Sequence, residues 1–185
     1  MRFFDQLSGL SDYFSIQENL SWTVVGRLTV EEAIRRLHGE PDTMARPAGP
    51  ISDPEYDDLT DTFFLEQRGE AVIIVGFGAL TAEALRRLSQ NTVVHSVFWL
   101  INNYNRLSYA VDGTVVTELD ILNPLDRWGT APDALTDHLD ALRALRDRPT
   151  PGPDWETAMA TLESLTGQRL TPDWFTHPQL LVKVQ

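Results

Sequence analysis

The side chains with the clearest capacity for ligand binding gather at the ends of expected strands and in the loop that follows them. They are Trp99, Asn102, Asn103, Asp120, Arg127 and Trp128. Indole rings can form apolar walls, while amide, carboxylate and guanidinium groups can provide the few polar contacts that orient a small molecule. The sequence therefore predicts a ligand-binding site here. A structural alternative stays open, in which Arg127 pairs with Asp120 to hold the loop and the indoles fill the core.

Acid–base catalysis is a second hypothesis for the same region. In it, Asp120 and His95 act together, oriented by Arg127, in a small hydrolase-like enzyme that needs no cofactor. The two side chains would have to approach to about 3 Å, directly or through one water. A structure that places them on opposite faces of the sheet would exclude this hypothesis. No residue is assigned a catalytic role from the sequence.

Motifs for other chemistries are weak or absent. The chain has no GxSxG elbow and no HExxH motif, and its four histidines have no partners at metal-ligand spacing. A Gly-Phe-Gly segment at 76–78 precedes an expected helix, as in dinucleotide-binding proteins, but Thr81 stands where the third glycine belongs. We therefore predict no metal and no cofactor.

A long segment without periodicity, 39–60, is expected to be a loop. Five acidic residues lie at its end, within nine positions: Asp53, Glu55, Asp57, Asp58 and Asp61. Loops longer than about 12–15 residues are uncommon unless they are functional or disordered. The acidic run has two interpretations, which are electrostatic steering of a cationic ligand or basic partner, and solubility.

Composition limits the class of protein. The 185 residues suit one domain, 1–185, and the lack of cysteine excludes disulfides and thiol chemistry. A formal charge of −12 disfavours nucleic-acid binding, because phosphate backbones repel such a surface. No apolar run approaches the roughly 20 residues that span a bilayer, and no signal-peptide pattern is visible. We expect a soluble, cytoplasmic protein with neither a nucleic-acid nor a membrane partner.

Periodicity and turn residues predict an α+β fold, with an antiparallel or mixed sheet of about six strands covered by about four helices. The expected strands are 21–28, 62–67, 71–77, 92–102, 106–111 and 114–121. The expected helices are 30–37, 82–88, 130–146 and 154–166, with a proline-rich connector at 147–153. Short turns, including Asp112-Gly113, join the last three strands into an antiparallel meander. Two strands, 71–77 and 92–102, are apolar on both sides, so both faces of the sheet should be covered.

Several short segments follow one another in an order and spacing that are similar to those of a known family. They are 28–37 (LTVEEAIRRL), 96–99 (SVFW), 109–113 (YAVDG), 127–129 (RWG) and 165–172 (LTGQRLTP). Over 22–174 the chain resembles an uncharacterised actinomycete family, known only as a domain of unknown function. The resemblance implies one α+β unit of actinomycete, cytoplasmic origin, and it carries no established activity or functional residue. One departure is Leu100 after Trp99, where the family usually has a polar residue.

Three classes of function stay open. The first hypothesis is a non-enzymatic binding or interaction module that recognises a protein partner or a small molecule, because catalytic and cofactor motifs are missing. The second is the Asp120/His95 enzyme. The third is a structural subunit of a larger assembly, which predicts an exposed apolar patch on the order of several hundred Å² or more. The sequence does not determine the oligomeric state.

Overall fold

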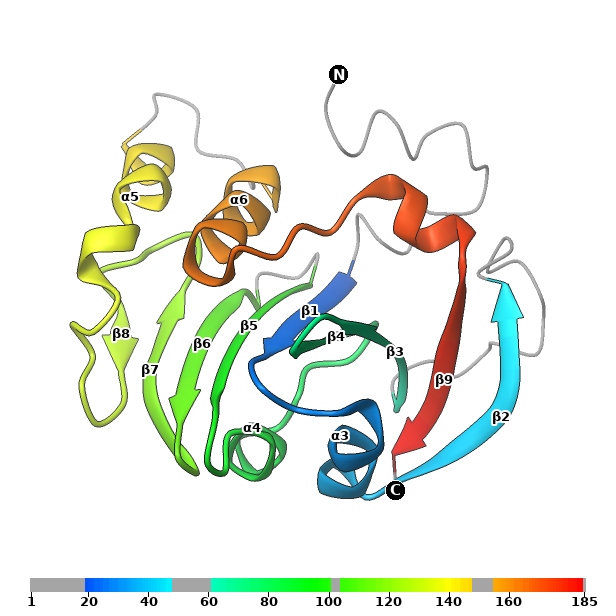
Figure 1. Ribbon diagram of the computed structural model, residues 1–185. Coiled ribbons are helices and arrows are strands. Elements are labelled where there is room, and N and C mark those ends of the chain that lie inside the picture. The colour runs from blue at the N-terminus through cyan, green and yellow to red at the C-terminus, as the bar shows by residue number, and fades with distance from the viewer. Residues whose placement is uncertain (1–18, 48–60, 101–103, 148–154, 185) are drawn as a thin grey trace.

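The computed structural model describes residues 19–47, 61–100, 104–147 and 155–184 (Figure 1). The strands are β1 (Asn19–Val25), β2 (Gly39–Pro47), β3 (Thr62–Arg68), β4 (Ala71–Gly76), β5 (Val93–Leu100), β6 (Arg106–Val111), β7 (Thr114–Asp120), β8 (Arg127–Trp128) and β9 (Pro178–Val184). The helices are α3 (Val30–Leu37), α4 (Ala82–Leu88), α5 (Asp140–Arg146) and α6 (Trp155–Thr166), with 3₁₀ helices η2 (Thr136–His138) and η3 (Pro172–Thr176).

All of these strands form one sheet in the order β2-β9-β3-β4-β1-β5-β6-β7-β8, and every neighbouring pair is antiparallel. The α+β class, the antiparallel sheet and the four α-helices in the described part of the chain are confirmed. The predicted number of strands, about six, is wrong. Eight strands have six residues or more, and the two-residue β8 extends one edge.

Residues 39–47, expected to begin the long loop at 39–60, are instead the edge strand β2. This strand pairs with β9 on one side only, with a register shift between Asp42 and Arg46. An edge strand tolerates Pro41 and Pro47 because one side of its backbone has no ladder to complete. Residues 48–60 lie outside the described residues, and with them the acidic run apart from Asp61.

Strand β9 is not among the strands that the sequence predicts. It fills the gap between β2 and β3, with Val182 opposite Phe63 and Leu181 opposite Phe64. The apolar residues of 180–184 are a strand signal in themselves. Their partners lie far away in the sequence, however, so no local turn indicates the pairing.

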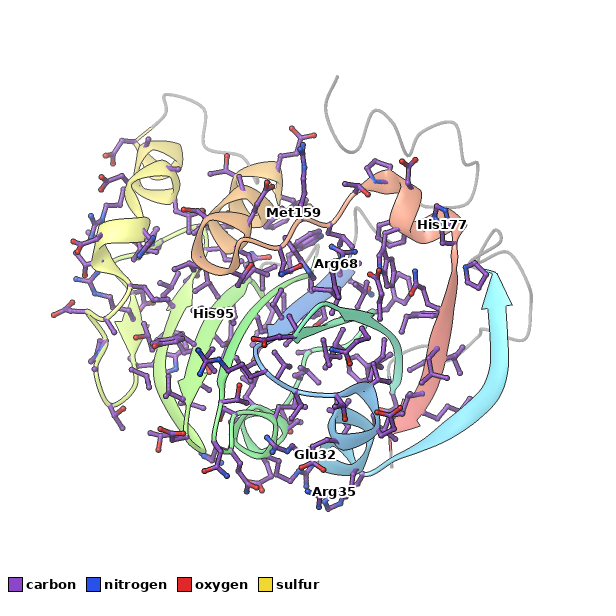
Figure 2. All side chains as sticks on the ribbon, in the orientation of Figure 1. Glu32, Arg35, Arg68, His95, Met159 and His177 are labelled. Carbon is purple, nitrogen blue, oxygen red and sulfur yellow. The ribbon has the colours of Figure 1, made fainter. Side chains whose placement is uncertain are left out.

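Helices cover both faces of the sheet, as the two-sided apolar strands predict (Figure 1). On one side, which we call the α5/α6 face, Leu142 and Met159 pack against strand residues. On the other side, the α3/α4 face, Leu85 belongs to a second core. Figure 2 shows this division, with Met159 on α6 on one side of the sheet and Glu32 and Arg35 on α3 on the other.

Strand β4 lies in the middle of this arrangement and is buried along its whole length. Ile73 and Val75 belong to the core on the α5/α6 face, while Val72 and Ile74 belong to the core on the α3/α4 face. This is the two-sided burial that its sequence predicts, because successive side chains of a strand point to opposite faces.

The predicted helix 130–146 begins later than expected. Ala131 still follows the edge of the sheet, because its amide donates to the Val116 carbonyl at 2.9 Å and its carbonyl accepts the Thr117 hydroxyl at 2.7 Å. The chain then turns through η2 before α5 starts at Asp140. The leucine spacing that predicts the helix survives as burial, since Leu135 and Leu139 both enter the core.

Local signals at helix starts and turns are confirmed. Thr29 caps α3 by accepting the Glu32 amide, and Thr81 caps α4 by accepting the Ala84 amide. Strands β5, β6 and β7 form the predicted meander, and the turn at Asp112-Gly113 has positive φ at both residues, 48° and 78°. Helix α6 matches its predicted bounds within one residue. None of the helices in the described residues is long and apolar enough to cross a membrane.

Candidate functional site

The six predicted ligand-binding residues do not form one site. Trp99 lies on the α5/α6 face, fully buried, with its ring stacked on Trp155 at a centroid distance of 5.3 Å. Arg127 is paired with Leu119 across the sheet and so lies on that face too, where it forms an ion pair with Asp133 at 2.6 Å. The proposed pair of Arg127 with Asp120 is therefore replaced by a pair within the following loop.

Asp120 and Trp128 lie on the opposite, α3/α4 face, because they alternate with Leu119 and Arg127 along their strands. One carboxylate oxygen of Asp120 accepts the Leu122 amide at 2.8 Å, which holds the turn after β7. Asn102 and Asn103 lie outside the described residues.

The pair required by the enzyme hypothesis is separated by the sheet. His95 is two residues before Val97 on β5 and therefore points to the same α5/α6 face. Its ring stacks on that of Tyr109 at a centroid distance of 4.7 Å. Burial, and to a smaller extent the nearby charge of His138, lowers the pKa of His95 from 6.5 to about 4. Asp120 lies on the other face, so the two side chains do not come together.

A cavity of about 520 Å³ lies on the α3/α4 face, between the start of α4 and the strands β5 to β8. Its lining comprises Ala79, Leu80, Thr81, Ala82, Leu85, Arg86, Ser96, Phe98, Tyr104, Arg106, Ser108, Val115, Glu118, Trp128, Gly129 and Thr130. Of the four predicted residues that the structure describes, Trp128 alone lines this cavity. The meander therefore does carry a cavity, but on the face away from Trp99.

The floor of the cavity is part of a row of polar side chains that crosses four strands, and Ser96, Ser108 and Glu118 are the members that line the cavity. Thr23, Ser96, Ser108 and Glu118 are neighbours in register on β1, β5, β6 and β7, and Trp128 continues the row on β8. All four polar residues are buried. The hydroxyls of Thr23 and Ser96 are 2.6 Å apart and hydrogen-bonded to each other, which satisfies the inner end of the row.

The adjacent row in the same strands shows how unusual this composition is. Its members point to the α5/α6 face and are apolar up to the edge strand: Trp22, Val97, Leu107 and Leu119. A buried polar group costs free energy unless it is hydrogen-bonded. Hydrogen bonds between Thr23 and Ser96 and between Arg106 and Glu118 offset part of this cost, and Ser96, Ser108 and Glu118 also border a cavity that water or a ligand can enter.

Arg106 projects from β6 beside this row and is held on three sides. Its guanidinium carbon lies 4.4 Å from the centroid of the Tyr104 ring and 5.1 Å from that of the Trp128 ring. Its Nη1 donates to the Glu118 carboxylate, whose side chain is only 8% exposed. The contacts with two rings and a charge-assisted hydrogen bond restrict the position of the guanidinium.

The rim of the cavity is formed by α4 and the segment after β8. Arg86 extends from α4 and forms an exposed ion pair with Glu83 at 3.3 Å. Gly129 has φ of +120° and approaches β7 so closely that a Cβ there would overlap the Val116 carbonyl. The lack of a side chain at Gly129 therefore lets this segment close one side of the cavity.

A second, more open depression lies beside α3 and the β3–β4 turn. Gln67 dominates it, with its amide nitrogen donating to the carbonyls of Leu28 and Gly69 and its oxygen accepting the Val30 amide. These bonds tie the start of α3 to the hairpin, so the role of Gln67 is structural. In the parts of the chain that the structure describes, no three His, Asp or Glu side chains cluster as a metal site.

One comparison with known proteins gives a result. The model of a family of unknown function (DUF6461) matches residues 10–182. The chain belongs to this family. No curated protein and no solved structure gives a significant match. The cavity on the α3/α4 face is therefore the main indication of function in this DUF6461 chain.

Sequence reasoning missed the charged centre of the DUF6461 cavity. Arg106 and Glu118 were expected only as parts of strands, yet the alternation of polar and apolar residues along 106–111 and 114–120 already assigns them one face. Among the described residues, Ser96, Ser108 and Glu118 form the only fully polar row that the register aligns across β5, β6 and β7 on that face. Arg106 lies in the neighbouring row on the same face, between Phe98 and Asp120. The signal was present, but it required the register of three strands.

Proposed function

We propose that this DUF6461 chain is a binding module for a small molecule, and that the ligand occupies the cavity on the α3/α4 face. The observation that carries the proposal is the buried polar row, with Ser96, Ser108 and Glu118 at the floor of a cavity of about 520 Å³. Ligand sites in proteins typically measure about 300–1,000 Å³ and combine apolar walls with a few convergent polar groups.

The walls favour a planar, partly apolar ligand. Phe98 lines the cavity from β5, Tyr104 from the segment before β6 and Trp128 from β8, and Leu85 lines it from α4. Aromatic rings pack against other flat groups with an energy beyond simple area burial. Trp128 is 40% exposed in the described structure, and a bound ligand would cover its free surface.

Binding is favoured over catalysis because the acid–base pair of the enzyme hypothesis, His95 and Asp120, is divided between two faces. It is favoured over a large protein interface because two of the three exposed large hydrophobic residues in the described part of the chain, Tyr104 and Trp128, already line the cavity. The cytoplasmic location and the actinomycete origin expected from the sequence stay predictions, as do a protein partner and a role as a structural subunit.

Closing the cavity from its floor tests the proposal. Ser108→Leu places a larger apolar side chain among the lining residues, whereas Thr114→Leu makes a similar change at an exposed position of the same hairpin. Small planar molecules would be screened by thermal shift and by quenching of tryptophan fluorescence. We expect ligands that raise the melting temperature of the wild type and of Thr114→Leu but not of Ser108→Leu. Equal responses of both variants would contradict the proposal.

A further inference from the structure

The chemical class of the ligand follows from the state of Arg106, provided that the cavity binds a small molecule as proposed above. We propose that the ligand carries a carboxylate-type anionic group, and that Arg106 is the residue that binds it. Arg106 is the charged side chain at the centre of the lining, between Tyr104, Trp128 and Glu118.

The guanidinium is already ordered before any ligand arrives. The two rings contact it at 4.4 Å and 5.1 Å, and Glu118 binds one of its terminal nitrogens. Its side chain is still 35% exposed, and the bond to Glu118 uses one of its two terminal nitrogens. A planar guanidinium offers donors in a fork that matches a carboxylate, and a preordered side chain loses little entropy on binding.

A cationic ligand would find the same site already occupied. Aromatic faces and a buried carboxylate are the groups that recognise ammonium ions, but here both are engaged by Arg106 itself. A cation would have to displace the guanidinium and leave it without its partner. An anion needs no such displacement, because it binds the donors that remain.

The charge of the lining points the same way. Arg86 and Arg106 against Glu118 give the lining a formal charge of +1, whereas the whole chain carries −12. The lining residues therefore carry one more positive than negative charge, while Glu83, outside the lining, pairs with Arg86. Arg86 stands at the rim, where its exposed pair with Glu83 leaves it able to turn toward an anion.

The test compares molecules that share a ring and differ in charge. Indole-3-acetate, indole-3-acetamide and tryptamine would be titrated into the full chain by calorimetry, together with the corresponding phenyl and naphthyl series. We expect the acetates to bind about 10- to 100-fold more tightly than the acetamides, as a charge-assisted pair in a partly buried site implies. The ammonium compounds should bind most weakly, and the preference should shrink as salt is added.

Variants assign the preference to Arg106. Removing the arginine alone would leave a buried, unpaired carboxylate, so the main variant is Arg106→Met with Glu118→Gln. Its control is Arg35→Met with Glu32→Gln, which removes the pairs of Glu32 with Arg35 and Arg36 on α3 and changes the net charge equally. Arg106→Lys provides a second test, because it keeps the charge and loses the planar fork.

The outcomes separate this inference from the proposed function. The proposed function and the anionic ligand class are both supported if the Arg106 variants lose the preference for acetates. In that case acetamide binding stays unchanged and the α3 control behaves like the wild type. If acetamides or ammonium compounds bind the wild type as tightly as acetates do, and Ser108→Leu blocks their binding, the anionic ligand class is overturned. The cavity is then still supported as the binding site. Failure of every compound to bind the wild type, or binding that Ser108→Leu leaves intact, overturns both.

Discussion

Replacing His95 should remove a specific part of the pH dependence of stability. The side chain lies mostly buried on β5, stacked on Tyr109, and burial lowers its pKa from 6.5 to about 4, with a smaller effect from the charge of His138. Between these two pH values, His95 binds a proton in the unfolded chain but not in the folded chain. The stabilisation is therefore complete above pH 6.5 and is lost as the pH falls toward 4.

The size of the effect follows from the shift. A difference of about 2.5 pH units corresponds to about 3 kcal/mol in the free energy of unfolding. Glu32 titrates in a different window: hydrogen bonds from Arg35 and then Arg36 lower its pKa from 4.5 to about 2, so its stabilisation is lost only below pH 4.5. Glu32 therefore contributes little to the change in stability between pH 6.5 and pH 4.5, where most of the His95 effect falls.

Urea denaturation followed by tryptophan fluorescence, repeated from about pH 7 to about pH 4.5, measures this contribution. His95→Phe keeps an aromatic ring against Tyr109 and cannot titrate, so its stability should fall by about 2–3 kcal/mol less than that of the wild type over the interval. His38→Asn is the matched control, because Asn tolerates the left-handed φ of 57° at this exposed helix cap. Parallel pH profiles for the wild type and His95→Phe would refute the reasoning.

Three further predictions concern stability and use the same denaturation assay. Trp99→Ala should lower the free energy of unfolding by about 3–5 kcal/mol, because the ring is fully buried and stacked. Trp128→Ala should lower it by about 1 kcal/mol or less. Equal losses would contradict the assignment of Trp99 to the core and Trp128 to the cavity. Gly129→Ala should cost about 2–4 kcal/mol, since its Cβ would overlap the backbone of β7, and a neutral result would show that this segment does not approach β7 as described. Thr29→Ala and Thr81→Ala should each cost about 1 kcal/mol through loss of a helix cap, and replacement by Ser should restore most of it.

Local chemistry made much of the fold predictable. The capping threonines of α3 and α4 satisfy amides within three residues, and the Asp112-Gly113 turn adopts positive φ by its own conformational preference. The two-sided apolar pattern of 71–76 required cover on both faces, which the two cores supply. Each of these features depends on residues close together in the chain.

The edge of the sheet escaped prediction for the opposite reason. Residues 39–47 contain prolines and little periodicity, and they form a strand only because β9 offers a ladder on one side. The delayed start of α5 has the same origin, since the hydrogen bonds of Ala131 to β7 outweigh helix formation there. Propensity is a weak guide where a partner from a distant part of the chain supplies the hydrogen bonds.

The candidate site shows the same division. The sequence by itself determined that polar and aromatic side chains would gather around the meander and that both sheet faces would be buried, because alternation and turn residues act locally. Tertiary structure alone decided which of them meet. It sent Trp99, His95 and Arg127 to one face, and it brought Arg106, Glu118 and Trp128 together on the other. The physical reason is that alternation along a strand determines the face to which a side chain points. Its neighbours on that face depend on strand register and on the helix that covers the face.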